Sequence, residues 1–175
     1  MTVELVPTRY DERENFIRNI QAAFKKAAVD EGGFSDDDEI IAREDVIESF
    51  DAAGAQILNI VRAGAIVGGA VVVIRPNNRN ELALLYVNVE HLGEGIGAAA
   101  WRAIEARYPQ TEVWETDTPY FAKRNLHFYI NKCGFHVVEF FNPHHKSPEL
   151  TDEDFPGSDY FFRFEKVMRG TRGCW

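Results

Sequence analysis

The segment Gly93-Glu94-Gly95-Ile96-Gly97 constrains the fold of this chain more than any other part of the sequence. Its three glycines occupy every second position, and they lie between an apolar run that ends near Val89 and a helix-like run over Ala98–Arg107. Glycine lets a ligand approach the main chain, and the start of a helix offers unpaired N–H groups that bind phosphate. The segment therefore predicts a cofactor-binding loop in which the Glu94 side chain points away from the phosphate. A tight turn against a closely packed helix is the structural alternative.

Hydrophobic periodicity predicts the order strand, two helices, three strands, helix, strand, helix and two strands. The expected ranges are 3–7, 11–28, 35–50, 56–61, 66–74, 81–89, 98–107, 112–117, 122–133, 135–141 and 159–167. The acidic run 35–38 is placed in the first turn of the second helix, as a cap or as a lid that presents carboxylates. Short links between the strands at 56–89 favour an antiparallel meander. The chain is thus one α/β domain of the α+β type over residues 1–168, with a tail at 169–175.

The charge and composition limit the class of partner. The net charge is −9, from 28 acidic and 19 basic residues, which disfavours nucleic acid and anionic membranes and favours cationic ligands. The charge also fits a purely solubilising role. The longest apolar run, Ala65–Ile74, is about half a membrane span, so no transmembrane helix is expected. The N-terminus lacks a secretory pattern, and Cys133 and Cys174 form no metal motif, which together indicate a reducing, cytoplasmic setting.

The glycine segment also fits a second class of protein. Gly93–Ala98 matches the dinucleotide fingerprint G-x-G-x-x-A, and Glu115 lies where a ribose-binding acid is expected. A nicotinamide or flavin oxidoreductase is therefore an alternative. The preceding meander and the short remaining chain weigh against it, because a doubly wound sheet needs parallel strands and more residues. A Walker site is excluded because no Lys-Ser or Lys-Thr follows the glycines.

Two motifs, Leu92–Gly97 and Asn125–Phe135, resemble those of the GNAT superfamily of N-acetyltransferases. The first corresponds to the pattern Q/R-x-x-G-x-G/A of that family, with Leu92 at the usual glutamine or arginine. The second corresponds to its Tyr…Gly-Phe signature, with one residue more than usual between Tyr129 and Gly134. The resemblance implies a central mixed, mostly antiparallel sheet of about seven strands, flanked by about four helices. It also implies acetyl-coenzyme A as co-substrate and no metal.

The resemblance assigns roles to individual residues. The main chain of Val87 and Val89 would hold the pantetheine arm and polarise the thioester carbonyl. The remaining cofactor-binding residues that it implies are Leu92, Gly93, Glu94, Gly95, Ile96, Gly97, Ala98 and Asn125. Tyr129 is the expected general acid, since it carries a hydroxyl on the apolar face of its helix. Glu115, with Asp117 and Glu90 as alternatives, is the expected general base, acting through water.

The predicted activity is acetyl transfer from acetyl-coenzyme A to a primary amine of a small molecule, peptide or protein, by direct attack in a ternary complex. A non-catalytic acyl-coenzyme A sensor is a third class that the sequence leaves open. The expected partner is the amine substrate, with no nucleic acid and no membrane, and the sequence leaves a homodimer open.

Overall fold

The computed structural model describes residues 1–148 and 159–168. The predicted tail at 169–175, with Cys174, and most of the polar segment before the last strand lie outside the described residues. The elements in chain order are β1 (Glu4–Pro7), η1 (Tyr10–Glu12), α1 (Arg13–Gly32), α2 (Arg43–Asp51), β2 (Ala55–Arg62), β3 (Ala65–Val73), β4 (Arg79–Val87), η2 (Val89–His91), α3 (Ile96–Arg107), β5 (Val113–Pro119), α4 (Lys123–His127), η3 (Phe128–Cys133), β6 (His136–Phe141) and β7 (Phe161–Val167).

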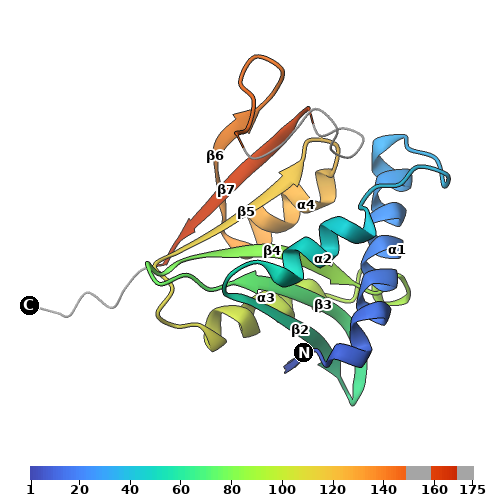
Figure 1. The fold of residues 1–175 in the computed structure, drawn as a ribbon, viewed down its shortest axis with the longest axis vertical. Helices are drawn as coiled ribbons and strands as arrows, with labels where there is room; N and C mark the ends of the chain where they lie inside the picture. Colours follow the sequence, from blue (N-terminus) through green and yellow to red (C-terminus); the bar gives the residue numbers. More distant parts are fainter. Residues whose placement is uncertain (149–158, 169–175) are drawn as a thin grey trace, which may run out of the picture.

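The seven strands form one sheet in the order β1-β2-β3-β4-β5-β7-β6. Every neighbouring pair is antiparallel except β4 and β5, which are parallel. Helices cover both faces, with α1 and α2 on one and α3 and α4 on the other (Figure 1). The expected mixed, mostly antiparallel sheet with four helices is therefore confirmed.

The core is divided between the two faces of the sheet. Trp101 of α3 and Trp114 of β5 pack edge to face, with ring centroids 5.4 Å apart, on the α3–α4 face. Phe16 of α1 packs against Phe50 of α2 at 5.2 Å on the other. Aromatic pairs of this geometry add to the free energy gained by burying their surface. Within the described residues, no helix has both the length and the apolar character needed to cross a bilayer.

A β-bulge in β4 changes which face its side chains take. Val71 and Val72 of β3 pair with Leu84 and Leu82, so Ala83 is an extra residue on β4. Leu82 consequently packs in the core on the α3–α4 face, and Leu84 in the core on the α1–α2 face. A bulge bends its strand and increases the local twist. The bulge therefore turns the second half of β4 away from β5, while β4 stays paired with β3.

Strands β4 and β5 stay together only over a short length. Their register joins residues 79–81 to 113–115 and ends at Glu81 opposite Glu115. One residue further on, the Thr116 hydroxyl donates a hydrogen bond to the Leu82 carbonyl at 2.9 Å, where the main chains begin to separate. The two strands then diverge, and this separation shapes the site described below.

The acidic run was predicted wrongly. Ser35–Asp38 does not begin the second helix; the Ser35 N–H bonds the Asp38 carboxylate at 2.8 Å, and the Asp38 N–H bonds the Ser35 carbonyl at 3.1 Å. These bonds make a separate turn. Helix α2 starts at Arg43, eight residues after Ser35, and there Asp45 accepts a hydrogen bond from the Ala42 N–H at 3.2 Å. Short acidic side chains satisfy local N–H groups in turns as readily as at helix starts, which explains the error.

The extra residue before Gly134 is accommodated in a π-helical turn. Helix α4 continues into η3, in which the Gly134 N–H bonds the Tyr129 carbonyl five residues earlier. Gly134 ends the segment with a φ of +81°, in the left-handed region. A π turn takes up one residue without ending the helix. Tyr129 and Cys133 consequently both stay buried, on the apolar face predicted from their spacing.

Candidate active site

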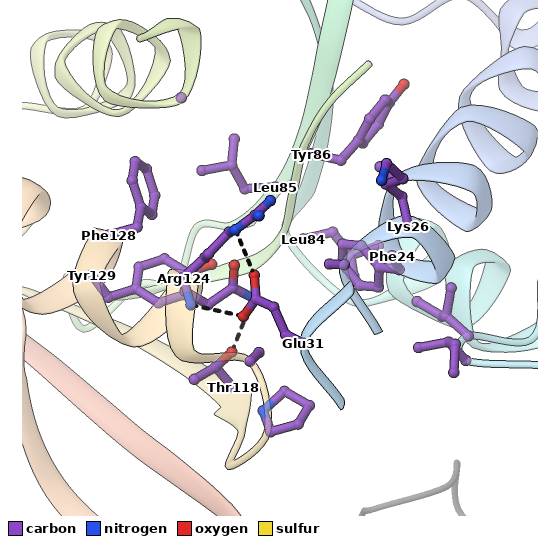
Figure 2. A pocket seen from close by; sticks show the side chains of 18 of the residues that line it. Phe24, Lys26, Glu31, Leu84, Leu85, Tyr86, Thr118, Arg124, Phe128 and Tyr129 are labelled. Atoms are coloured by element: carbon purple, nitrogen blue, oxygen red, sulfur yellow. Dashed lines mark hydrogen bonds and ion pairs between the residues drawn. The ribbon is translucent and has the colours of Figure 1, made fainter. Parts of the chain in front are cut away.

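A pocket of about 530 Å³ lies where β4 and β5 separate. One wall, which we call the loop side, comes from the glycine loop, α3 and the start of α4–η3: Leu92, Gly93, Gly97, Asn125 and Phe128. The opposite wall, the α1 side, comes from α1, the segment before α2 and the β5–α4 link: Ala23, Phe24, Ala27, Ile40, Ile41 and Phe121. Leu84–Val87 of β4 and 117–119 of β5 join the two walls. Figure 2 shows Phe24 and Lys26 of α1 facing Phe128 and Tyr129 across this space.

The glycine loop is shaped by backbone conformations that glycine favours. Gly93 and Gly95 have φ values of +82° and +77°, and Gly95 is the N-terminal cap of α3. The first hydrogen bond within the helix runs from the Ala99 N–H to the Gly95 carbonyl, so the N–H groups of residues 96–98 have no partner of this kind. Three N–H groups and the positive end of a twelve-residue helix thus meet at the loop.

At position 97, glycine is favoured by close packing and not by backbone conformation. A Cβ atom at this position would lie 3.2 Å from the Phe128 ring, which is tighter than ordinary packing. Gly97 therefore lets α3 pack closely on the helical segment that carries Tyr129. Ile96 is 1% exposed and packs in the core, and the side chain of Ala98 is only a methyl group. Only the main chain of these two residues can therefore form hydrogen bonds with a ligand at the loop.

The Glu94 carboxylate is held away from the helix start. Its oxygen accepts a hydrogen bond from the Arg62 guanidinium at 2.5 Å, and the His91 ring lies 3.3 Å from the other oxygen. These hydrogen bonds lower the pKa of Glu94 below its usual range, and the bond from Arg62 has the larger effect. The one acidic residue of the loop is thus paired with a guanidinium, which removes its repulsion of an anion.

The two valines expected to hold the pantetheine arm take different positions. Val87 ends β4 and lines the pocket, whereas Val89 lies just beyond, in η2, and does not line it. Leu92 lies on the loop side and is 43% exposed. An apolar side chain at this position offers no hydrogen bond to a phosphate.

Tyr129 lies at the point where the strands separate. Its side chain is 7% exposed and lines the pocket, close to Thr116, whose hydroxyl donates to the Leu82 carbonyl. Burial raises the pKa of Tyr129 well above its ordinary value, and the nearby charge of Asp117 raises it further. The phenol therefore stays protonated at neutral pH.

Asn125 connects the loop side to β5. Its amide donates a hydrogen bond to the Thr118 hydroxyl at 3.2 Å, and both residues line the pocket. The bond fixes the start of α4 to the end of β5. Asn125 is thus brought together with Tyr129, Leu92, Gly93 and Gly97 in one site.

Glu115 lies elsewhere. Its carboxylate accepts hydrogen bonds from Arg75 at 3.0 Å and Arg79 at 2.7 Å, with Arg163 3.5 Å away, and it does not line the pocket. Burial alone would raise its pKa, but these arginines outweigh burial and the pKa lies below the usual range. A carboxylate committed to three guanidinium groups is a weak proton acceptor. Glu115 thus belongs to an ion-pair network across the sheet and lies outside the pocket lining.

Of the other two acids considered, Asp117 lines the pocket, two residues beyond Glu115 on β5, and is exposed. Glu90 is exposed in η2 and is not part of the lining. Among residues 1–148 and 159–168, no three His, Cys, Asp or Glu side chains are grouped so as to hold a metal ion.

The sequence did not predict the α1 side of the pocket. Glu31, near the end of α1, pairs with Arg124 of α4, with 2.9 Å between a carboxylate oxygen and the guanidinium Nε. The Arg124 main-chain N–H also donates to the Glu31 carboxylate at 2.9 Å (Figure 2). These residues lie 93 positions apart in the sequence, so no local pattern could have paired them.

A model of the acetyltransferase (GNAT) family matches residues 16–135, which include the glycine loop and Tyr129. The chain belongs to this family, and it is an acyltransferase. It is 48% identical over 161 residues to the uncharacterized protein YrkN of Bacillus subtilis, a match that covers 88% of this chain and 87% of YrkN.

Solved acetyltransferases share the fold at low sequence identity. An acetyltransferase of Thermus thermophilus is 15% identical with a TM-score of 0.68, covering 96% of this chain and 98% of its own. A GNAT acetyltransferase of Elizabethkingia anophelis with acetyl-CoA bound is 11% identical with a TM-score of 0.67, covering 95% and 99%. The PaiA N-acetyltransferase of Thermoplasma acidophilum in complex with coenzyme A is 18% identical with a TM-score of 0.64, covering 96% and 100%.

Proposed function

We propose that this acetyltransferase takes its acetyl group from acetyl-coenzyme A and transfers it to a primary amine while both reactants are bound. The observation that carries the proposal is a pocket at the separation of β4 and β5 that has the glycine loop and Tyr129 on one wall and α1 on the other. Acetyltransferases of the same fold have been solved with coenzyme A or acetyl-CoA bound, which supports this choice of donor.

The loop side is the proposed donor site. The unpaired N–H groups of residues 96–98 would bind the pyrophosphate, with Gly93 and Gly95 giving the loop its shape. The main chain of Val87 and Val89 would align the pantetheine arm along the end of β4, so that the thioester reaches the separation of the strands. Asn125 would hold the other edge of the arm. The Glu94–Arg62 pair keeps the loop free of uncompensated negative charge.

The proposed chemistry is direct aminolysis of the thioester. The neutral amine attacks the carbonyl carbon, a C–N bond forms, and an oxyanion develops that main-chain N–H groups at the end of β4 can stabilise. The C–S bond then breaks, and the thiolate takes the proton of the Tyr129 hydroxyl. The nitrogen loses its surplus proton through water to Asp117, which, unlike Glu115 and Glu90, lines the pocket. Bulk water restores the proton of Tyr129.

Coupled measurements of binding and thiol release test the proposal. We expect acetyl-CoA to raise the melting temperature and NADH or FAD to leave it unchanged, because only the first ligand suits the loop and the separated strands. We also expect coenzyme A thiol to appear only when a primary amine is added. Stabilisation by acetyl-CoA with no thiol from a broad panel of amines would identify a sensor instead, and stabilisation by NADH or FAD would favour an oxidoreductase.

A further inference from the structure

The α1 side of the pocket is apolar over most of its lining. Its apolar residues, from three separate segments, are Ala23, Phe24, Ala27, Ile40, Ile41 and Phe121, and the charged residues that line the pocket beside them are Lys26, Glu31 and Arg124. Phe121 also packs against Phe34 with its ring tilted by 60° and the ring centroids 4.8 Å apart, which fixes the wall that closes this side. These apolar residues favour a ligand that covers their surface, and they provide no hydrogen-bond partner for a polar body. The lining thus favours a ligand whose body is hydrocarbon.

The cations at the pocket are already compensated. Lys26 lies 2.7 Å from the Asp30 carboxylate, and Arg124 lies 2.9 Å from Glu31 and 4.0 Å from Asp30. The Glu31 side chain is only 10% exposed, so its charge is largely committed to Arg124. An anionic group on the ligand would have to compete with these carboxylates for both cations. The pocket is therefore unsuited to an amino acid or another acidic acceptor.

Two carboxylates, those of Glu31 and Asp117, line the pocket, and the Glu31 carboxylate is paired with Arg124. Asp117 lies at the end of β5 near Tyr129, close enough for its charge to raise the pKa of that residue. It is positioned to attract an ammonium group to the place where the strands separate. A second ammonium, carried farther along the molecule, would face the apolar residues of the α1 side or a Glu31 carboxylate that Arg124 already neutralises. A charge without a partner is strongly disfavoured there.

We infer that the acceptor is a primary monoamine carried on an apolar aliphatic or aromatic body, rather than a polyamine, an amino sugar or an amino acid. The inference rests on the proposed function, because it assigns the α1 side to the acceptor. The amine enters toward Tyr129 and Asp117, and its body packs against Phe24, Ile41 and Phe121.

Three acceptors of equal chain length test the inference: n-hexylamine, 1,6-diaminohexane and 6-aminohexanoate. Their reacting amines have similar pKa values, so the neutral fraction is matched and only the far end differs. We expect kcat/KM for n-hexylamine to exceed that of each of the others at least tenfold. Between n-butylamine and n-hexylamine, kcat/KM should rise roughly fourfold per methylene until the pocket is filled.

A charged variant of the α1 side sharpens the test. Ile41→Asp places a carboxylate on the wall, so 1,6-diaminohexane should gain at least tenfold relative to n-hexylamine. Val138→Asp is the matched control, because Val138 is 50% exposed on β6 and does not line the pocket. It should leave the order of the acceptors unchanged. Circular dichroism establishes that both variants are folded.

Binding of the same three amines to the protein loaded with coenzyme A separates the two claims. If thiol is released but the diamine or the amino acid is preferred, the inferred acceptor class is wrong and the proposed function stands. If n-hexylamine binds best but no amine releases thiol, the proposed transfer is wrong and the assigned pocket chemistry stands. If the three amines bind equally or not at all, the inference is overturned.

Discussion

The loop side and the α1 side of the pocket are built in different ways. The loop side depends on the main chain: two left-handed glycines, the start of α3 and the end of β4 present N–H groups along a continuous stretch of sequence. The α1 side depends on side chains, such as Phe24, Ile41 and Phe121, that come from separate segments. If the two sides bind donor and acceptor as proposed, donor recognition through the backbone would withstand side-chain changes, whereas acceptor recognition would change with each substitution.

Tyr129, which lies between the two sides, should give the largest effect. Tyr129→Phe keeps the ring on the apolar face and removes only the hydroxyl. We expect kcat to fall roughly 10²-fold, because the leaving thiolate loses its proton donor, with little change in the Kd for acetyl-CoA. Tyr108→Phe is the matched control, since Tyr108 packs against Trp114 away from the pocket and should retain full kcat. Full activity of Tyr129→Phe would make the tyrosine a core residue only.

A substitution at Gly95 should weaken cofactor binding on the loop side and leave the α1 side unchanged. Gly95 has a φ of +77°, and valine at this position would drive the loop out of the left-handed region. We expect the Kd for acetyl-CoA, measured by calorimetry, to rise roughly 30-fold, about 2 kcal/mol, because binding must then restore the strained conformation. Gly33→Val is the control, with a φ of +72° and equally open space around its Cβ. Equal weakening by both variants would show a general loss of stability and not a cofactor loop.

Variants of Asp117 and Glu115 should distinguish an effect on catalysis from an effect on the stability of the sheet. Asp117→Asn should lower kcat/KM for the amine about tenfold, since it acts through water from an exposed position. Glu115→Gln should change kcat/KM less than about twofold. It should instead lower the free energy of unfolding by about 1–2 kcal/mol, because its ion pairs with Arg75 and Arg79 are only partly exposed.

The stability effect of Glu115 should depend on pH. Its folded pKa is lowered, so its contribution is present above the unfolded pKa, about 4.3, and is lost as the pH falls through the folded value. Urea unfolding of the parent and of Glu115→Gln should therefore differ at pH 7 and converge below about pH 4. A large loss of kcat with unchanged stability would return the role of base to Glu115.

The smallest expected effect concerns the compensated charge of the loop. Glu94→Gln removes the carboxylate and leaves Arg62 to attract the pyrophosphate, so the Kd for acetyl-CoA should fall about threefold. Arg62→Gln leaves Glu94 uncompensated, and the Kd should rise by a similar factor. The double variant should lie near the parent. If neither single variant changes the Kd, the pair has no bearing on cofactor binding, and this account of the charge of the loop is wrong.

The sequence predicted the parts of this molecule that depend on local chemistry. The sheet and its helices, the glycine loop and the buried position of Tyr129 follow from periodicity, glycine placement and family motifs. The β4 bulge at Ala83 did not, because an apolar run has the same appearance with or without an extra residue. The Glu31–Arg124 pair and the arginines around Glu115 did not either, since these contacts join residues 36 to 93 positions apart.

Initial-rate kinetics test most directly the central claim, that both reactants meet in one pocket entered from opposite sides. With acetyl-CoA and n-hexylamine varied together, we predict intersecting double-reciprocal lines and one N-acetylated amine per thiol released. Parallel lines, with a burst of thiol equal to the enzyme concentration before any amine is added, would contradict the account. That result would require a covalent acyl-enzyme and would separate the two half-reactions that this pocket is proposed to join.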